Sequence, residues 1–132
     1  MHVLLIEPDK LLAQVYTLAL ERAGHSVAHA RSAQAAVHAA DEQLPDVVVL
    51  ELQLPRHNGI EFLYEFRSYS EWRHIPVLLH TYVRPGELAP AATLHDQLGV
   101  LATLYKPATN LEQLCMAVAQ LGLPAAPAEV SA

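Results

Sequence analysis

The chain has 132 residues, a length that fits one domain and leaves little room for a second. Hydrophobic residues make up 52% of the chain and charged residues 17%, proportions that argue against a disordered protein. The net charge is −6 without any cluster of Lys and Arg, so we expect no direct binding to nucleic acid, and no apolar run is long enough to cross a membrane. The single cysteine, Cys115, excludes an internal disulfide and favours a reducing compartment, which makes the cytoplasm the expected location.

Short apolar runs alternate with stretches of helical periodicity along the sequence. Residues 3–6 and 47–50 are continuous apolar runs, which are typical of strands buried on both faces of a sheet. Ser32 is suited to cap a helix, and Pro90 is tolerated only in the first turn of one. In the first half of the chain, we predict a strand over 3–6, a helix from 11 that stops at Gly24, a weak strand over 26–30, a helix from Ser32 that Pro45 ends, and a strand over 47–50. In the second half, we predict a helix around 62–66, a strand over 76–81, a weak helix over about 87–98, a strand over 100–105 and a helix over 111–121.

Five strands that alternate with five helices predict a doubly wound α/β domain, a parallel sheet with helices on both faces. We assign residues 1–121 to this domain and expect the Ala/Pro-rich segment 122–132 to be a flexible tail or linker. Ligand chemistry in such folds lies at the carboxyl ends of the strands. The residues of interest are therefore those at which the apolar runs end: Glu7, Asp9, Glu51, Thr81, Tyr82 and Lys106.

Three segments resemble parts of the receiver domain of bacterial response regulators. Residues 45–55 followed by Asn58-Gly59 look like the family's third strand and the loop after it. Residues 75–81 look like its fourth strand, which ends in a hydroxyl residue, and residues 105–107 look like its Lys-Pro signature. The resemblance covers about residues 2–121 and implies a flavodoxin-like, five-stranded sheet in the order 2-1-3-4-5.

The resemblance also implies a phosphotransfer site, but this sequence departs from the family pattern there. In the family, an aspartate at the end of the third strand accepts a phosphoryl group, and acids after the first strand hold Mg²⁺. Here Glu51 stands at the phosphoacceptor position, and Pro8 stands where the direct metal ligand is expected. The extra methylene of Glu51 moves its carboxylate by roughly 1.5 Å, an error that in-line attack tolerates poorly. The same methylene lets the carboxylate reach toward Thr81 and Lys106, which look like the family's phosphate-reading hydroxyl and lysine.

Two interpretations of Glu51 stay open: it imitates part of the phosphorylated state, or it forms a structural ion pair with Lys106. Glu7 and Asp9 make an acidic pocket beside it, although Asp9 is also suited to cap the first helix. With proline in place of a metal ligand, we expect no cofactor, or Mg²⁺ bound only weakly. Tyr82 follows Thr81 where the family has a small residue, and we expect its ring to cover the pocket. No Cys or His spacing indicates another metal site.

We therefore predict an atypical receiver that acts in signal transduction or transcriptional regulation without phosphorylation, by dimerising or by docking to a protein such as a DNA-binding output domain. In the family the fourth helix, fifth strand and fifth helix form the output face, and the candidate contacts here are His95, Tyr105, Met116 and Gln120. The alternative is a conventional phosphoacceptor receiver of a two-component system that uses a non-standard site. A third class, a haloacid-dehalogenase-like phosphatase, has the Glu7-x-Asp9 spacing but needs an aspartate nucleophile, so we expect no enzyme.

Overall fold

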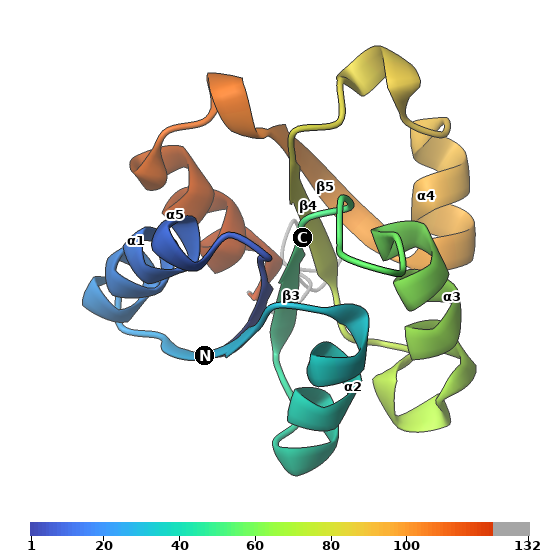
Figure 1. Cartoon of the computed structure of the whole chain (residues 1–132), viewed down its shortest axis with the longest axis horizontal. Helices are drawn as coiled ribbons and strands as arrows, with labels where there is room; N and C mark the ends of the chain where they lie inside the picture. Colours follow the sequence, from blue (N-terminus) through green and yellow to red (C-terminus); the bar gives the residue numbers. More distant parts are fainter. Residues whose placement is uncertain (123–132) are drawn as a thin grey trace, which may run out of the picture.

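One parallel sheet forms the centre of the computed structural model, which describes residues 1–122 (Figure 1). Its strands lie in the order β2-β1-β3-β4-β5, so the predicted fold class and strand order are confirmed. All neighbouring strands run parallel. The strands are β1 (His2–Ile6), β2 (Ser26–Ala30), β3 (Val47–Leu50), β4 (Val77–Thr81) and β5 (Val100–Tyr105). Their carboxyl ends therefore meet at one edge of the sheet. The predicted tail, apart from Gly122, lies outside the described residues.

Helices cover both faces of this sheet (Figure 1). The α-helices are α1 (Lys10–Arg22), α2 (Ala33–Glu42), α3 (Gly59–Ser68), α4 (Ala91–Leu98) and α5 (Leu111–Leu121), and the short 3₁₀ helices are η1 (Ser70–Trp72), η2 (Pro85–Glu87) and η3 (Lys106–Ala108). Side chains of α1 and α5 pack on one face, and side chains of α2, α3 and α4 pack on the other. In the part of the chain that the structure describes, no helix has the length and apolar character needed to cross a bilayer.

The apolar strand runs are explained by this two-sided cover. All four residues of β3 and all five of β4 are buried, because helices pack above and below them. On the α2–α4 face, the rings of Phe62, Phe66 and Trp72 form a stack with centroids 5.2 Å and 5.0 Å apart. Since β3 and β4 are held by packing on both sides, the residues at their carboxyl ends have fixed places at the edge of the sheet.

The weak fourth helix differs from its prediction in length. The pattern predicts one helix over about 87–98, but the structure has η2 at Pro85–Glu87 and then α4, which begins at Ala91 directly after Pro90. Proline lacks the backbone N–H and clashes with the preceding turn, so a helix cannot run through it. The helix is therefore confined to the residues after Pro90.

Candidate functional site

Four buried polar side chains meet at the carboxyl edge of the sheet. Each ends or follows a strand, and the four are Glu7 after β1, Glu51 after β3, Thr81 at the end of β4 and Lys106 after β5. The exposed fractions of the whole residues are 2%, 2%, 0% and 7% in that order. The strand ends thus bring together residues that are up to 99 positions apart in the sequence. We refer to these four residues as the carboxyl-edge cluster.

Lys106 lies between the two carboxylates of this cluster. Its Nζ is 2.5 Å from Oε1 of Glu7 and 2.9 Å from Oε1 of Glu51. Burying an ion is costly unless it is paired and hydrogen-bonded, and here one ammonium offsets two carboxylates. The contact between Glu51 and Lys106 is the one that the sequence predicts. The contact with Glu7 was not predicted, although Glu7 is itself buried after a mostly buried strand and needs a partner for the same reason.

The Glu51 carboxylate is fully engaged by hydrogen bonds. Oε2 accepts from the Thr81 hydroxyl and from the backbone N–H of Gln53, at 3.2 Å for the latter. Oε1 accepts from Lys106 and from the backbone N–H of Tyr82 at 3.2 Å. Burial raises the pKa of Glu51, but the hydrogen bonds from Thr81 and Lys106, together with the Lys106 charge, outweigh it and hold that pKa below its ordinary value. Glu51 is therefore ionised and fixed in place.

The two predicted pocket acids have separate places. Glu7 is part of the carboxyl-edge cluster, and its Oε2 accepts a hydrogen bond from the backbone N–H of Asp9 at 3.0 Å. Asp9 is exposed, and its own carboxylate caps α1 by accepting from the N–H groups of Leu11 and Leu12 at 2.9 Å and 3.0 Å. Asp9 thus lies at the rim of the cluster, with its side chain at the helix terminus.

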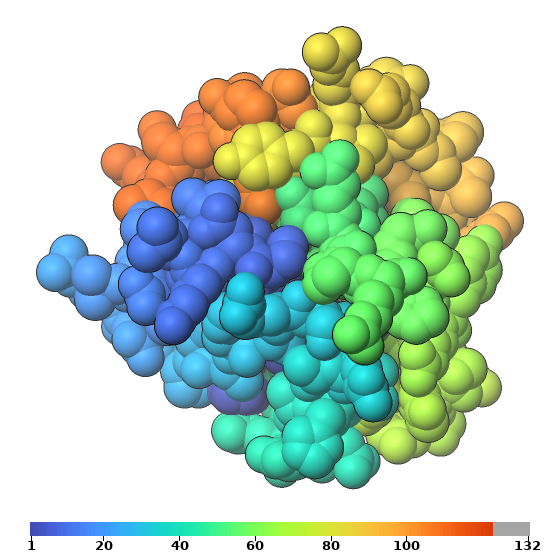
Figure 2. All heavy atoms as spheres, viewed as in Figure 1, coloured from blue at the N-terminus to red at the C-terminus, as the bar shows by residue number. Residues whose placement is uncertain are grey.

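Tyr82 lies over the cluster. The Lys106 ammonium is 4.7 Å from the centroid of the Tyr82 ring, and the tyrosine is 48% exposed, so one side of the ring faces solvent. A cation beneath an aromatic face is stabilised by the ring's quadrupole. Figure 2 shows the segment after β4, in yellow, reaching across between the orange segment after β5 and the green segment after β3.

Tyr16 and His80 contact each other near the cluster, and the sequence analysis did not predict this contact. The ring of His80 on β4 is 4.8 Å from that of Tyr16 on α1, edge to face. Burial and the charge of Lys106 lower the pKa of His80 to about 4. Burial, with a smaller contribution from Glu7, raises the pKa of Tyr16 to about 12. Both rings are therefore neutral at physiological pH, so they add no charge beside the cluster.

The predicted interaction face lies on consecutive elements at one edge of the sheet. His95 on α4 and Met116 and Gln120 on α5 are exposed, and Tyr105 on β5 is half-buried. The pairing of β4 with β5 shifts by one residue at Leu101, which lies between the β5 partners of Val77 and Leu78. Leu101 is 46% exposed. Leu101 lines one shallow hollow with His95 and another with Gln120. The three elements thus form one continuous surface with exposed apolar side chains.

Within residues 1–122, no group of three or more His, Cys, Asp or Glu side chains lies close enough together to hold a metal ion. The two carboxylates of the carboxyl-edge cluster face Lys106 instead. What the arrangement does chemically is to hold an anionic carboxylate between a hydroxyl, backbone N–H groups and an ammonium.

Comparisons with known proteins agree with this fold. The family model described as "Response regulator receiver domain" matches residues 3–119. "Probable transcriptional regulatory protein TcrX" of Mycobacterium tuberculosis is 38% identical over 79 residues, which are 60% of this chain and 33% of that protein. The "Polar-differentiation response regulator DivK" of Brucella ovis is 30% identical over 79 residues, 60% of this chain and 64% of that protein. The crystal structure of a sensor protein from Polaromonas sp. JS666 has a TM-score of 0.81 and 23% identity, covering 92% of this chain and 94% of that one. The matched part of the chain therefore spans less than two thirds of these curated relatives.

Proposed function

The chain belongs to the response regulator receiver family, and we propose that it works within signal transduction without being phosphorylated. The observation that carries this proposal is the position of the Glu51 carboxylate, which bridges Thr81 and Lys106. In the receiver family, the hydroxyl and the lysine at these positions read the transferred phosphoryl group. Here a carboxylate of the protein itself already occupies them.

The same contacts favour imitation of the phosphorylated state over a purely structural ion pair. An ion pair needs only Lys106, whereas Glu51 also accepts from Thr81 and from the Tyr82 N–H. These are donors suited to phosphoryl oxygens. The imitation is incomplete, because a carboxylate carries one charge and two oxygens, and a phosphoryl group carries about −1.5 to −2 and three.

The donor set does not fit Mg²⁺, which prefers a near-octahedral shell of oxygens. Pro8 has no side-chain oxygen, and the carboxylates of Glu7 and Glu51 face an ammonium that repels a divalent cation. We therefore propose a domain that needs no cofactor and binds Mg²⁺ only weakly. Phosphatase chemistry is disfavoured for a related reason, since Glu7 is paired with Lys106 and Asp9 caps a helix, which leaves neither as a free nucleophile.

We expect no phosphoryl transfer to this domain from acetyl phosphate in the presence of Mg²⁺. The Glu51 carboxylate is bound to Thr81 and Lys106 and is not free for in-line attack. The donor set of the described residues does not suit Mg²⁺, so we expect the intact mass to stay unchanged after incubation. A Glu51→Gln variant treated in parallel serves as the control. A gain of one phosphoryl group by the wild type that is lost in this variant would make Glu51 a working phosphoacceptor and would support the conventional receiver instead.

The proposed output is contact with another protein through α4, β5 and α5. Exposed apolar residues on this surface, such as Leu101 and Met116, are 46% and 55% exposed, and exposed apolar patches mark interaction sites. The partner is a second copy or an output domain. A DNA-binding output is consistent with the description of TcrX as a transcriptional regulatory protein three times the length of the matched segment. The single, partly buried Cys115 agrees with a place in the cytoplasm.

For the dimer form of this proposal, we expect size-exclusion chromatography with light scattering to show association that increases with concentration. A Met116→Glu variant should weaken it by on the order of tenfold, because a charge would then be buried at the interface. Leu18→Glu is the matched control, since Leu18 on α1 is 49% exposed and lies outside this surface. A monomer at all concentrations would contradict dimerisation.

A further inference from the structure

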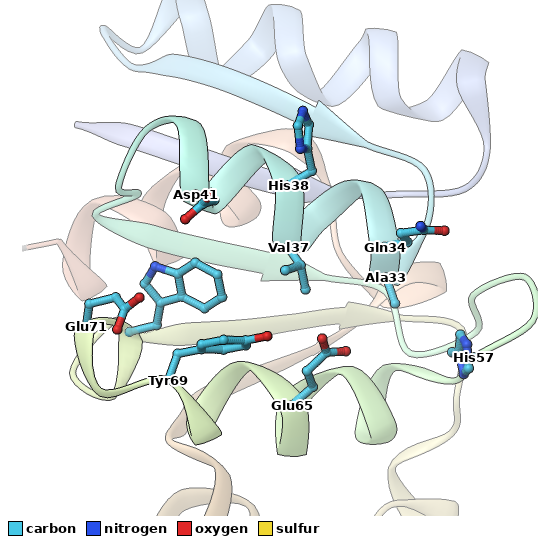
Figure 3. Close-up of a pocket in the computed structure, with 10 residues that line it drawn as sticks. Ala33, Gln34, Val37, His38, Asp41, His57, Glu65, Tyr69 and Glu71 are labelled. Atoms are coloured by element: carbon cyan, nitrogen blue, oxygen red, sulfur yellow. The ribbon is translucent and has the colours of Figure 1, made fainter.

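A groove separates α2 from α3 and η1, away from the carboxyl-edge cluster. It is a hollow of about 730 Å³ in which Val37 and Asp41 come from α2, and Glu65, Tyr69, Glu71 and Trp72 come from α3 and the residues after it. Figure 3 shows Asp41 and Val37 above the groove, and Glu65, Tyr69 and Glu71 below it, with their side chains directed into the space between the helices. The groove lies on the face of the sheet opposite α1 and α5.

Apart from the histidines His38 and His57, the charged residues that line this groove are all acidic. Asp41, Glu65 and Glu71 contribute three carboxylates, and no Lys or Arg is among the residues that line it. Within residues 1–122, none of these three acids forms an ion pair. The groove therefore attracts cations and repels nucleic acid. A bound metal ion is not favoured, since no three of the described acids and histidines are close enough to hold one.

The aromatic side of the groove adds two further binding features. Tyr69 is 38% exposed, and its ring centroid is 4.6 Å from that of Trp72. An exposed aromatic face beside carboxylates stabilises an ammonium or guanidinium group. Trp72 is only 3% exposed, yet its indole N–H donates to no group in the described part of the chain. The indole nitrogen itself reaches solvent, because Nε2 of His2 is the only fully buried side-chain N or O without a partner in the described residues. Trp72 lines the groove, so it offers an open donor that matches a peptide carbonyl.

We propose that this groove is a docking site for a basic peptide segment of a partner protein. A Lys or Arg side chain would lie against Tyr69 between Asp41 and Glu65, and a backbone carbonyl of the segment would accept from Trp72. Each of the three features matches one part of such a segment. The carboxylates attract the cationic side chain, the Tyr69 ring stacks against it, and the Trp72 indole N–H donates to a backbone carbonyl. This surface is distinct from the one formed by α4, β5 and α5, so the domain has a second place at which to engage a protein.

The test uses the fact that Trp72 is the only tryptophan in the chain, so its indole N–H gives a single signal in a ¹⁵N–¹H correlation spectrum. The probe is a short acetylated peptide in which Lys and Ala alternate, and the matched peptide has Glu in place of Lys. We expect the basic peptide to shift the indole signal saturably and the acidic peptide to leave it unchanged. An unmoved indole signal with the basic peptide would overturn the proposal.

Charge variants separate this site from general attraction to an acidic protein. Asp41→Asn with Glu65→Gln should weaken the basic peptide by about three- to tenfold, the effect of removing two exposed ion pairs. Glu21→Gln with Glu112→Gln removes the same charge from exposed positions on α1 and α5 and should change the affinity less than twofold. Equal weakening by both pairs would show non-specific attraction. An indole signal that moves with protein concentration alone, and not with peptide, would assign the groove to a second copy. Either result overturns the proposal.

Discussion

Replacing Lys106 with methionine should lower the free energy of unfolding by about 3–5 kcal/mol, the cost of leaving a buried charge without its partner. The side chains of Lys106, Glu7 and Glu51 are 3%, 3% and 2% exposed, so water cannot replace the ammonium. Methionine keeps the length of the side chain and its apolar stem, and thus isolates the charge. Urea denaturation at neutral pH measures the effect.

Lys10→Met is the matched control, because Lys10 is exposed at the start of α1 and its loss should cost less than about 0.5 kcal/mol. A Lys106→Met variant that loses less than about 1 kcal/mol would show that the two carboxylates do not depend on the ammonium. In that case the ion pairs of the carboxyl-edge cluster would contribute little to the free energy of unfolding.

The pH dependence of the two proteins should have opposite signs. In the wild type, the pKa of Glu51 is held below its ordinary value, so its ionised form contributes stability above that ordinary value and loses it as the pH falls through the folded-state pKa. In Lys106→Met, two unpaired carboxyl groups favour binding a proton in the folded state, so stability should fall as the pH rises. The difference between the two proteins should therefore widen from about pH 5 to pH 8.

The double variant Glu51→Asp with Pro8→Asp should bind Mg²⁺ at least about tenfold more tightly than the wild type. Aspartate at position 51 withdraws the carboxylate from Thr81 and leaves room in the cluster, and aspartate at position 8 supplies the oxygen that proline lacks. Each further carboxylate ligand raises the affinity of an oxygen site for a divalent cation. Isothermal titration calorimetry with MgCl₂ measures the change.

Each single variant serves as a control for the double variant. Glu51→Asp alone still lacks the oxygen at position 8, and Pro8→Asp alone still has the longer Glu51 carboxylate bound to Thr81 and Lys106. We expect both to bind Mg²⁺ more weakly than the double variant. No gain in the double variant would mean that the pocket differs from a working receiver at more than these two positions.

The sequence predicted the place of the carboxyl-edge cluster because the rule behind it is simple. Continuous apolar runs indicated strands buried on both faces, and the ends of parallel strands meet at one edge. Glu51, Thr81 and Lys106 could therefore be placed together without coordinates. The contact between Glu7 and Lys106 depends on which oxygen faces the ammonium, and neither periodicity nor composition contains that information.

The groove between α2 and α3 had no signal in the sequence at all. Its acids are exposed: Asp41 and Glu65 are at ordinary helical positions and Glu71 is in η1, and Tyr69 lies between α3 and η1. Their convergence depends on the angle and distance between two helices, which tertiary packing sets. The start of α4 was predictable in part. Pro90 indicated a helix boundary, but nothing in the pattern indicated the separate 3₁₀ turn at Pro85–Glu87.

The contact between Lys106 and Glu7 joins positions 99 residues apart. Closing a loop of that length costs chain entropy before the contact can contribute any stabilisation, so the contact forms only after the intervening strands have assembled. It is then largely absent from the folding transition state. Such a contact governs how slowly the native protein unfolds and has little influence on how fast it folds.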